Sequence, residues 1–254
     1  MNYLRQLKLQ LKIFLLEKIH WLILVLALVL LFTDISFKNN NTFSPVYINN
    51  LSRSVFLFTS IVYGVLATRF FLMEVSKQSQ IQWARPSFRA NLVLVKFFAM
   101  FFGVLILLLP TLVIMLIRGV SFNNLAGLVQ GASIWFYLFT STFLFATVLS
   151  ILSGLLLRKP ALAMPFTLIC LIWLAIRQTV WPDLFKYYVS ESFGLLFGYG
   201  PIRETLQLNR GYFLILSFSL LLLAILIGHF ILPANKGKLK LKNSILWFSF
   251  FLFF

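Results

Sequence analysis

Residues 91–117 read NLVLVKFFAMFFGVLILLLPTLVIMLI, and Lys96 is the one ionisable side chain in this stretch. An α-helix rises ~1.5 Å per residue and the hydrocarbon core of a bilayer is ~30 Å thick, so about 20 apolar residues can cross it. The stretch is longer than this requirement. It therefore predicts a transmembrane helix.

The whole chain has the same character. Hydrophobic residues make up 61% of it and charged residues 11%, and the mean hydropathy is +0.95. A soluble domain carries about 25% charged residues. So few charges cannot cover a water-facing surface, and lipid is the expected solvent for most of the chain.

Other apolar segments reach or approach the spanning length. With 91–117 they give six predicted spans: 19–33, 51–73, 91–117, 129–157, 161–180 and 211–232. We therefore expect an all-α integral membrane protein with six transmembrane helices in one domain, residues 1–233. The segment 129–157 is longer than a perpendicular span needs and should tilt.

Residues 234–254 form a second predicted unit. Four lysines between 236 and 242 make a basic segment, and the apolar run from Ser244 to Phe254 follows. That run, about 11 residues, is too short to span. It is either an interfacial tail or the start of a truncated seventh span, and the cost of burying a carboxylate after Phe254 favours the second.

The basic residues predict the orientation. With the N-terminus in the cytosol, 15 of the 22 Lys and Arg residues fall inside and 7 fall outside. The outer ones are Lys38, Arg53, Arg118, Arg177, Lys186, Arg203 and Arg210. The positive-inside rule therefore predicts a multi-pass protein of the cytoplasmic membrane with a cytosolic N-terminus. The net charge of +16 is spread over short loops, which favours membrane lipids over nucleic acid as its partner.

The segment before the first span has amphipathic spacing. Arg5, Lys8 and Lys12 lie at i, i+3 and i+7 beside a stripe of leucines, so a helix here can lie in the headgroup layer with its cations on lipid phosphates. The alternative is a plain extension of the first span. At the other face, the aromatic, Pro-containing connection 181–210 predicts short helices that dip into the outer leaflet.

Signals of enzyme chemistry are nearly absent. No phosphate-binding G-x-x-x-x-G-K-[ST] sequence occurs, and the single Cys170 excludes an intrachain disulfide. His20 and His229 are expected near the inner ends of spans one and six with no carboxylate beside either, which favours interfacial anchoring over metal binding. We expect no catalytic residue, no metal site and no cofactor in this chain.

The connection between spans two and three is the most informative segment. Glu74 ends span two, Arg85 and Arg89 flank Pro86 at helical spacing, and Lys96 follows one turn into span three. Pro86 should end one helix and start the next. A solvated positive-inside loop is the alternative explanation from charge alone.

This layout resembles the membrane subunit of ABC transporters of the type-2 exporter class. That family has an amphipathic elbow helix, six spans, and an acidic residue followed by a P-x-x-R turn and a Lys between spans two and three. Glu74, Pro86, Arg89 and Lys96 match that order. Residues 149–155 with Arg158 resemble the end of the family's span four, and the aromatic connection 181–210 resembles its re-entrant outer hairpin between spans five and six.

The resemblance implies a transport subunit that is not itself an enzyme. A separate ABC ATP-binding subunit would bind ATP, and a second permease copy, in a homo- or heterodimer, would complete the substrate path. The coupling loop to the ATPase would comprise Glu74, Arg85, Pro86, Arg89 and Lys96, with Arg158 and Lys159 as a second cytosolic contact. The candidate residues for the path or the dimer face are Ser133, Thr140, Ser141, Thr147 and Ser150, although helix packing through small residues would also explain them.

The sequence bears on two other classes of function. A membrane enzyme that acts on lipids should show clustered His or carboxylate residues at one depth, and the sequence shows none. A non-transporting immunity or assembly protein that binds a hydrophobic peptide or lipid through residues 181–210 is compatible with the sequence.

Overall fold

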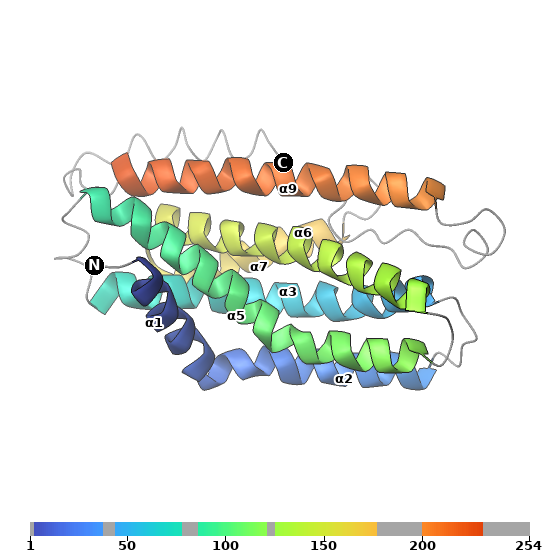
Figure 1. Cartoon of the computed structure of the whole chain (residues 1–254). Helices are drawn as coiled ribbons and strands as arrows, with labels where there is room; N and C mark the ends of the chain where they lie inside the picture. The colour runs from blue at the N-terminus through green and yellow to red at the C-terminus, as the bar shows by residue number, and fades with distance from the viewer. Residues whose placement is uncertain (1–2, 38–43, 78–85, 121–124, 177–199, 231–254) are drawn as a thin grey trace.

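The computed structural model describes residues 3–37, 44–77, 86–120, 125–176 and 200–230, and every element in these ranges is a helix (Figure 1). In chain order the elements are α1 (Tyr3–Leu16), the short 3-10 helix η1 (Lys18–His20), α2 (Trp21–Phe37), α3 (Ser44–Lys77), α5 (Pro86–Val120), α6 (Leu125–Leu157), α7 (Pro160–Ile176) and α9 (Gly200–Phe230).

Several of these helices can cross a membrane. Four contain long apolar stretches, namely Val55–Leu72, Asn91–Ile117, Gly131–Leu157 and Arg210–Gly228. The bent pair Tyr3–Leu16 and Lys18–Thr33 would make a fifth, and the apolar helix Pro160–Ala175 is shorter. The described part of the chain is therefore all-helical, and the protein is a multi-pass membrane protein, as its composition predicts.

The long helices lie side by side, and α6 is the central one (Figure 1). It packs against α3, α5, α7 and α9. Other parts of the chain bury 83% of its apolar stretch, against 33% of the stretch in α9. The helix α2 packs on α3 and α5 at the edge, and α1 crosses α5 obliquely.

Most helices extend beyond the predicted apolar segments. For example, α5 begins at Pro86 rather than residue 91, and α3 covers 44–77 rather than 51–73. Hydropathy detects the part of a helix that lipid or protein must bury, whereas the backbone can continue its hydrogen bonds into the polar interface. The start of α5 at Pro86 agrees with the predicted role of this proline.

The helix α9 also begins before its predicted apolar segment, because it is helical from Gly200 onward, whereas its apolar stretch Arg210–Gly228 agrees with the predicted span 211–232. Pro201 is tolerated there because the first turn of a helix has no intrahelical partner for its N–H groups. The other part of the predicted re-entrant hairpin, residues 181–199, lies outside the described residues, as does the predicted unit 234–254.

Hydroxyl groups join α3 to α6 and α7 in the middle of the bundle, an interface that we call the hydroxyl seam. The Tyr63 hydroxyl and Thr147 Oγ1 are 2.7 Å apart, and Ser150 Oγ donates to the Gly64 carbonyl at 2.8 Å. Thr167 Oγ1 on α7 bonds the hydroxyls of Thr68 and Ser153, at 3.0 and 2.6 Å. The seam therefore satisfies buried polar groups between three helices, a common way of joining helices in membranes.

Candidate functional site

The chain turns sharply between α1 and α2. The two helical segments are bent by 68°, and Glu17 between them has an extended backbone with φ −72° and ψ 108°. The last carbonyls of a helix have no intrahelical partner. A stable bend therefore requires other groups to bond the carbonyl oxygens at the end of α1.

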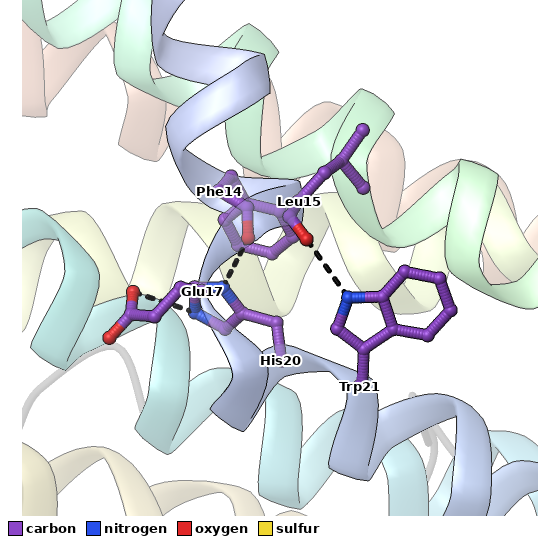
Figure 2. Close-up of polar contacts among 5 residues, drawn as sticks. All are labelled: Phe14, Leu15, Glu17, His20 and Trp21. Atoms are coloured by element: carbon purple, nitrogen blue, oxygen red, sulfur yellow. Dashed lines mark hydrogen bonds and ion pairs between the residues drawn. The ribbon is translucent and has the colours of Figure 1, made fainter.

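Two side chains that follow the bend supply those bonds (Figure 2). His20 Nδ1 lies 2.7 Å from the Phe14 carbonyl oxygen, and Trp21 Nε1 donates to the Leu15 carbonyl at 2.9 Å. A carbonyl oxygen can only accept, so Nδ1 of His20 carries a proton. His20 and Trp21 therefore cap the carbonyl groups at the end of α1.

A carboxylate faces the other nitrogen of the same imidazole (Figure 2). Glu17 Oε2 lies 3.7 Å from His20 Nε2, and His20 is 1% exposed. The sequence-based expectation of a lipid-interface anchor with no neighbouring carboxylate is therefore wrong for His20. The bend brings residues 17 and 20 onto one side. The sequence predicted a separate amphipathic helix before the first span but not the position of this bend. His229 has no described side chain.

Phe14 connects this bend to the helix bundle. Its fully buried ring stacks on His20 at 3.9 Å between centroids and meets Phe70 of α3 edge-on at 5.2 Å. On α5 the ring covers Gly103, where a Cβ atom would lie only 2.3 Å from Phe14 Cδ1. Glycine is therefore required for this close approach.

Lys96 joins α5 to the same region of α3. It is fully buried, and its Nζ donates to the Phe71 carbonyl at 2.9 Å and lies 5.1 Å from the Phe71 ring centroid. A cation within about 6 Å of an aromatic face is attracted to it. The side chain of Lys96 consequently lies inside the chain rather than on a surface that a partner could touch.

We call this group the elbow cluster. Its members come from α1, η1, α3 and α5, and they are Phe14, His20, Phe70, Phe71, Lys96 and Gly103. Its α3 members lie within the last two turns before Lys77, and its α5 members lie 10 and 17 residues after the start of α5 at Pro86. The cluster therefore holds together the two helices that flank the predicted coupling loop and the bent N-terminal helix.

The other predicted coupling residues are placed only in part. Glu74 belongs to α3, and Pro86 and Arg89 belong to the first turn of α5. The positions of their side chains, and residue Arg85 as a whole, lie outside the described part of the chain.

The predicted second contact lies at the turn between α6 and α7. Arg158 and Lys159 are exposed there, and Arg158 has φ 54°. A left-handed residue is a common way to end a helix, and Arg158 N donates to the Gly154 carbonyl at 3.0 Å. The turn is at the same end of the bundle as α1, the end of α3 and the start of α5 (Figure 1).

The five hydroxyl residues proposed for a path or dimer face do not share one surface. Ser141, Thr147 and Ser150 are buried, and the last two bond α3 in the hydroxyl seam. Thr140 is half-buried and bonds the Phe136 carbonyl of its own helix, whereas Ser133 is exposed. Packing within the chain therefore accounts for Thr147 and Ser150.

Sequence reasoning did not single out Phe14, Gly103 or the contact between Glu17 and His20. The only feature of the sequence that could have indicated the contact between Glu17 and His20 is their i, i+3 spacing. Among the described residues no group of three or more His, Cys, Asp or Glu side chains could hold a metal ion. Comparisons with protein-family models, with curated proteins and with solved structures found no match.

Proposed function

We propose that this chain is the membrane subunit of an ATP-driven ABC exporter of the type-2 class. In this proposal the bent pair α1–α2 and the helices α3, α5, α6, α7 and α9 supply an elbow and six spans. The N-terminus and the elbow cluster face the cytosol of a cell whose cytoplasmic membrane holds the protein. A separate subunit binds and hydrolyses ATP.

The attachment of α1 to the helices on either side of residues 78–85 is the observation that carries this proposal. Phe14 is packed on Gly103 of α5 and on Phe70 of α3, and Lys96 ties α5 to the Phe71 carbonyl of α3. A force applied to the loop would therefore move α1, α3 and α5 together. This is the mechanical property that a coupling loop needs.

Each predicted contact then has a definite role. Glu74, Arg85 and Arg89 would dock on the ATP-binding subunit, Pro86 would set the start of α5, and Lys96 would transmit the movement inside the chain. Arg158 and Lys159, exposed on the turn between α6 and α7, would touch the same partner. Two copies of the chain would enclose a path for an amphiphilic peptide, lipid or drug, because the spans are apolar.

The test is a comparison of two double charge reversals in the tagged chain, purified from its own cell membranes. Arg85→Glu with Arg89→Glu alters the coupling loop, and Lys38→Glu with Arg53→Glu alters the predicted outer face by the same charge. We expect a co-purified ATPase whose activity falls about tenfold or more in the first variant only, as removal of buried polar contacts at an interface commonly causes.

Two results would contradict the proposal. One is the absence of ATPase activity in the purified assembly, which would favour the immunity or assembly function. The other is an unchanged ATPase rate in the Arg85→Glu, Arg89→Glu variant when circular dichroism shows that it is folded.

A further inference from the structure

One face of α1 combines exposed cations with a concave surface. Arg5, Lys8 and Lys12 are all exposed, and with Leu9 they line a concavity of about 580 Å³. The concavity is open to the outside and is lined mainly by the aliphatic parts of these side chains. The helix contains no acidic residue, so nothing within α1 neutralises these charges.

The same helix also exposes large apolar side chains. Leu4 is 69% exposed, Leu9 52% and Leu16 67%. These leucines lie among the cations rather than on a separate face. A small inorganic anion would satisfy the cations and leave the leucines in water, whereas an amphiphile with a negative head satisfies both.

The bend determines how this face meets the membrane. The 68° bend means that α1 and α2 cannot both follow the membrane normal. We take α2, which contains no Lys or Arg, as the part that crosses, and this choice turns α1 toward the membrane plane. The burial of Phe14 against Gly103 fixes the rotation of α1 about its own axis. Arg5, Lys8 and Lys12 are therefore held in one orientation on the exposed side of α1.

We propose that this face of α1 is a binding site for an anionic phospholipid. The phosphate accepts hydrogen bonds from Arg5, Lys8 and Lys12, with the guanidinium able to bond two phosphate oxygens at once. The acyl chains lie along Leu9, Ile13 and Leu16. The site does not depend on the transport function proposed above.

The experiment measures lipid binding to the full chain in detergent by native mass spectrometry. Phosphatidylglycerol is compared with phosphatidylcholine for the unmodified chain and for Arg5→Gln, Lys8→Gln, Lys12→Gln. Each cation near an anionic surface contributes about fivefold. We therefore expect the triple variant to lose phosphatidylglycerol affinity by on the order of 100-fold and to bind phosphatidylcholine as before.

A control variant separates a built site from general charge attraction. Lys18→Gln, Arg158→Gln, Lys159→Gln removes the same charge from other exposed positions and should change phosphatidylglycerol affinity by about twofold or less. An equal loss in both triple variants would overturn the proposal. If the first triple variant does not fold, the double variant Lys8→Gln, Lys12→Gln should still lose more affinity than Lys18→Gln, Lys159→Gln.

A further pair of measurements separates a lipid from free phosphate. Leu9→Ser with Ile13→Ser should weaken phosphatidylglycerol binding, and excess inorganic phosphate should not displace the lipid from the unmodified chain. Full displacement by inorganic phosphate together with unchanged binding by the serine variant would show a phosphate site and overturn the lipid assignment.

Discussion

The hydroxyl seam and the elbow cluster use neighbouring turns of the same helix, α3, in different ways. In the seam Tyr63, Gly64 and Thr68 meet α6 and α7 through hydroxyl and carbonyl groups. In the cluster Phe70 and Phe71 meet α1 and α5 through rings and one buried cation.

This difference separates the contacts that stabilise the whole helix bundle from those that attach α1 to it. The seam joins long helices around α6, the most buried apolar stretch of the four spanning helices, and its helices cannot separate without unfolding. The cluster fastens the peripheral helix α1 largely through one ring, Phe14. We therefore expect damage to the seam to act on the whole bundle and damage at Phe14 to release α1 alone.

Lys96 should be an exception to this rule. It belongs to the elbow cluster, but it joins the long helices α3 and α5, so its loss should destabilise the whole bundle. Lys96→Glu places a carboxylate against the Phe71 carbonyl in a fully buried position. A hydrogen bond to a charged group contributes about 1.5–3 kcal/mol, and a carboxylate cannot bond the carbonyl that Lys96 leaves, so we expect a decrease of about 3 kcal/mol in the free energy of unfolding. The measurement is denaturation of the chain in mixed micelles.

The matched control is Lys159→Glu, which makes the same charge reversal at an exposed position. We expect it to change the unfolding free energy by less than about 0.5 kcal/mol. Equal effects in the two variants would show that Lys96 is not a structural contact.

The packing of Phe14 on Gly103 should behave as a local attachment. Gly103→Leu overfills the space that the ring occupies, and overpacking costs about 1–3 kcal/mol. Hydrogen–deuterium exchange should rise in α1 and stay constant in α6. Gly211→Leu is the control, because no atom lies within 4 Å of a Cβ added there.

A rescue sharpens this prediction. Adding Phe14→Ala to Gly103→Leu removes the clash and lets the leucine fill part of the space, so the combined effect should be smaller than the sum of the single effects. Strict additivity would mean that the two residues are not in contact.

The coupling energy between two residues of the hydroxyl seam, Tyr63 and Thr147, should be smaller than the effects above. Thr147→Val removes the partner of the Tyr63 hydroxyl, and hydrogen bonds between membrane helices contribute about 0.6 kcal/mol on average and up to ~1.7. A double-mutant cycle with Tyr63→Phe should give a coupling energy in this range. Thr140→Val, whose hydroxyl bonds its own helix, should couple to Tyr63→Phe by about zero.

The smallest effect is expected at the exposed edge of the bend. Trp21→Phe removes the bond to the Leu15 carbonyl, and an exposed hydrogen bond contributes about 0.5 kcal/mol. Exchange should increase only for the last turn of α1. Trp173→Phe, at an exposed tryptophan of α7, is the control and should leave α1 unchanged.

Much of the architecture could be predicted from the sequence, because apolar length is a one-dimensional property. The segment 91–117 required a helix, and Pro86 indicated where that helix begins. The start of α9 at Gly200 could not be predicted from the sequence, because the aromatic and polar residues before 211 are compatible with a loop and with a helix. Tertiary contacts decide between the two.

The cluster could not be predicted for a different reason. The chain contains 30 phenylalanines, and nothing local distinguishes Phe14, whose partner Gly103 lies on another helix. Lys96 likewise resembled a surface lysine, since its position near a helix start suits both snorkelling and burial. The buried carbonyl of Phe71 that it bonds is visible only after α3 and α5 pack.

The contact between Phe14 and Gly103 also imposes an order on biosynthesis. The two residues are about 90 positions apart, and a ribosome adds ~5–20 residues per second. The N-terminal helix is therefore made on the order of 5–20 s before its receptor on α5 exists. During that interval Phe14 lacks the glycine on which it packs, so the attachment of α1 to the bundle is completed only after α5 has been made.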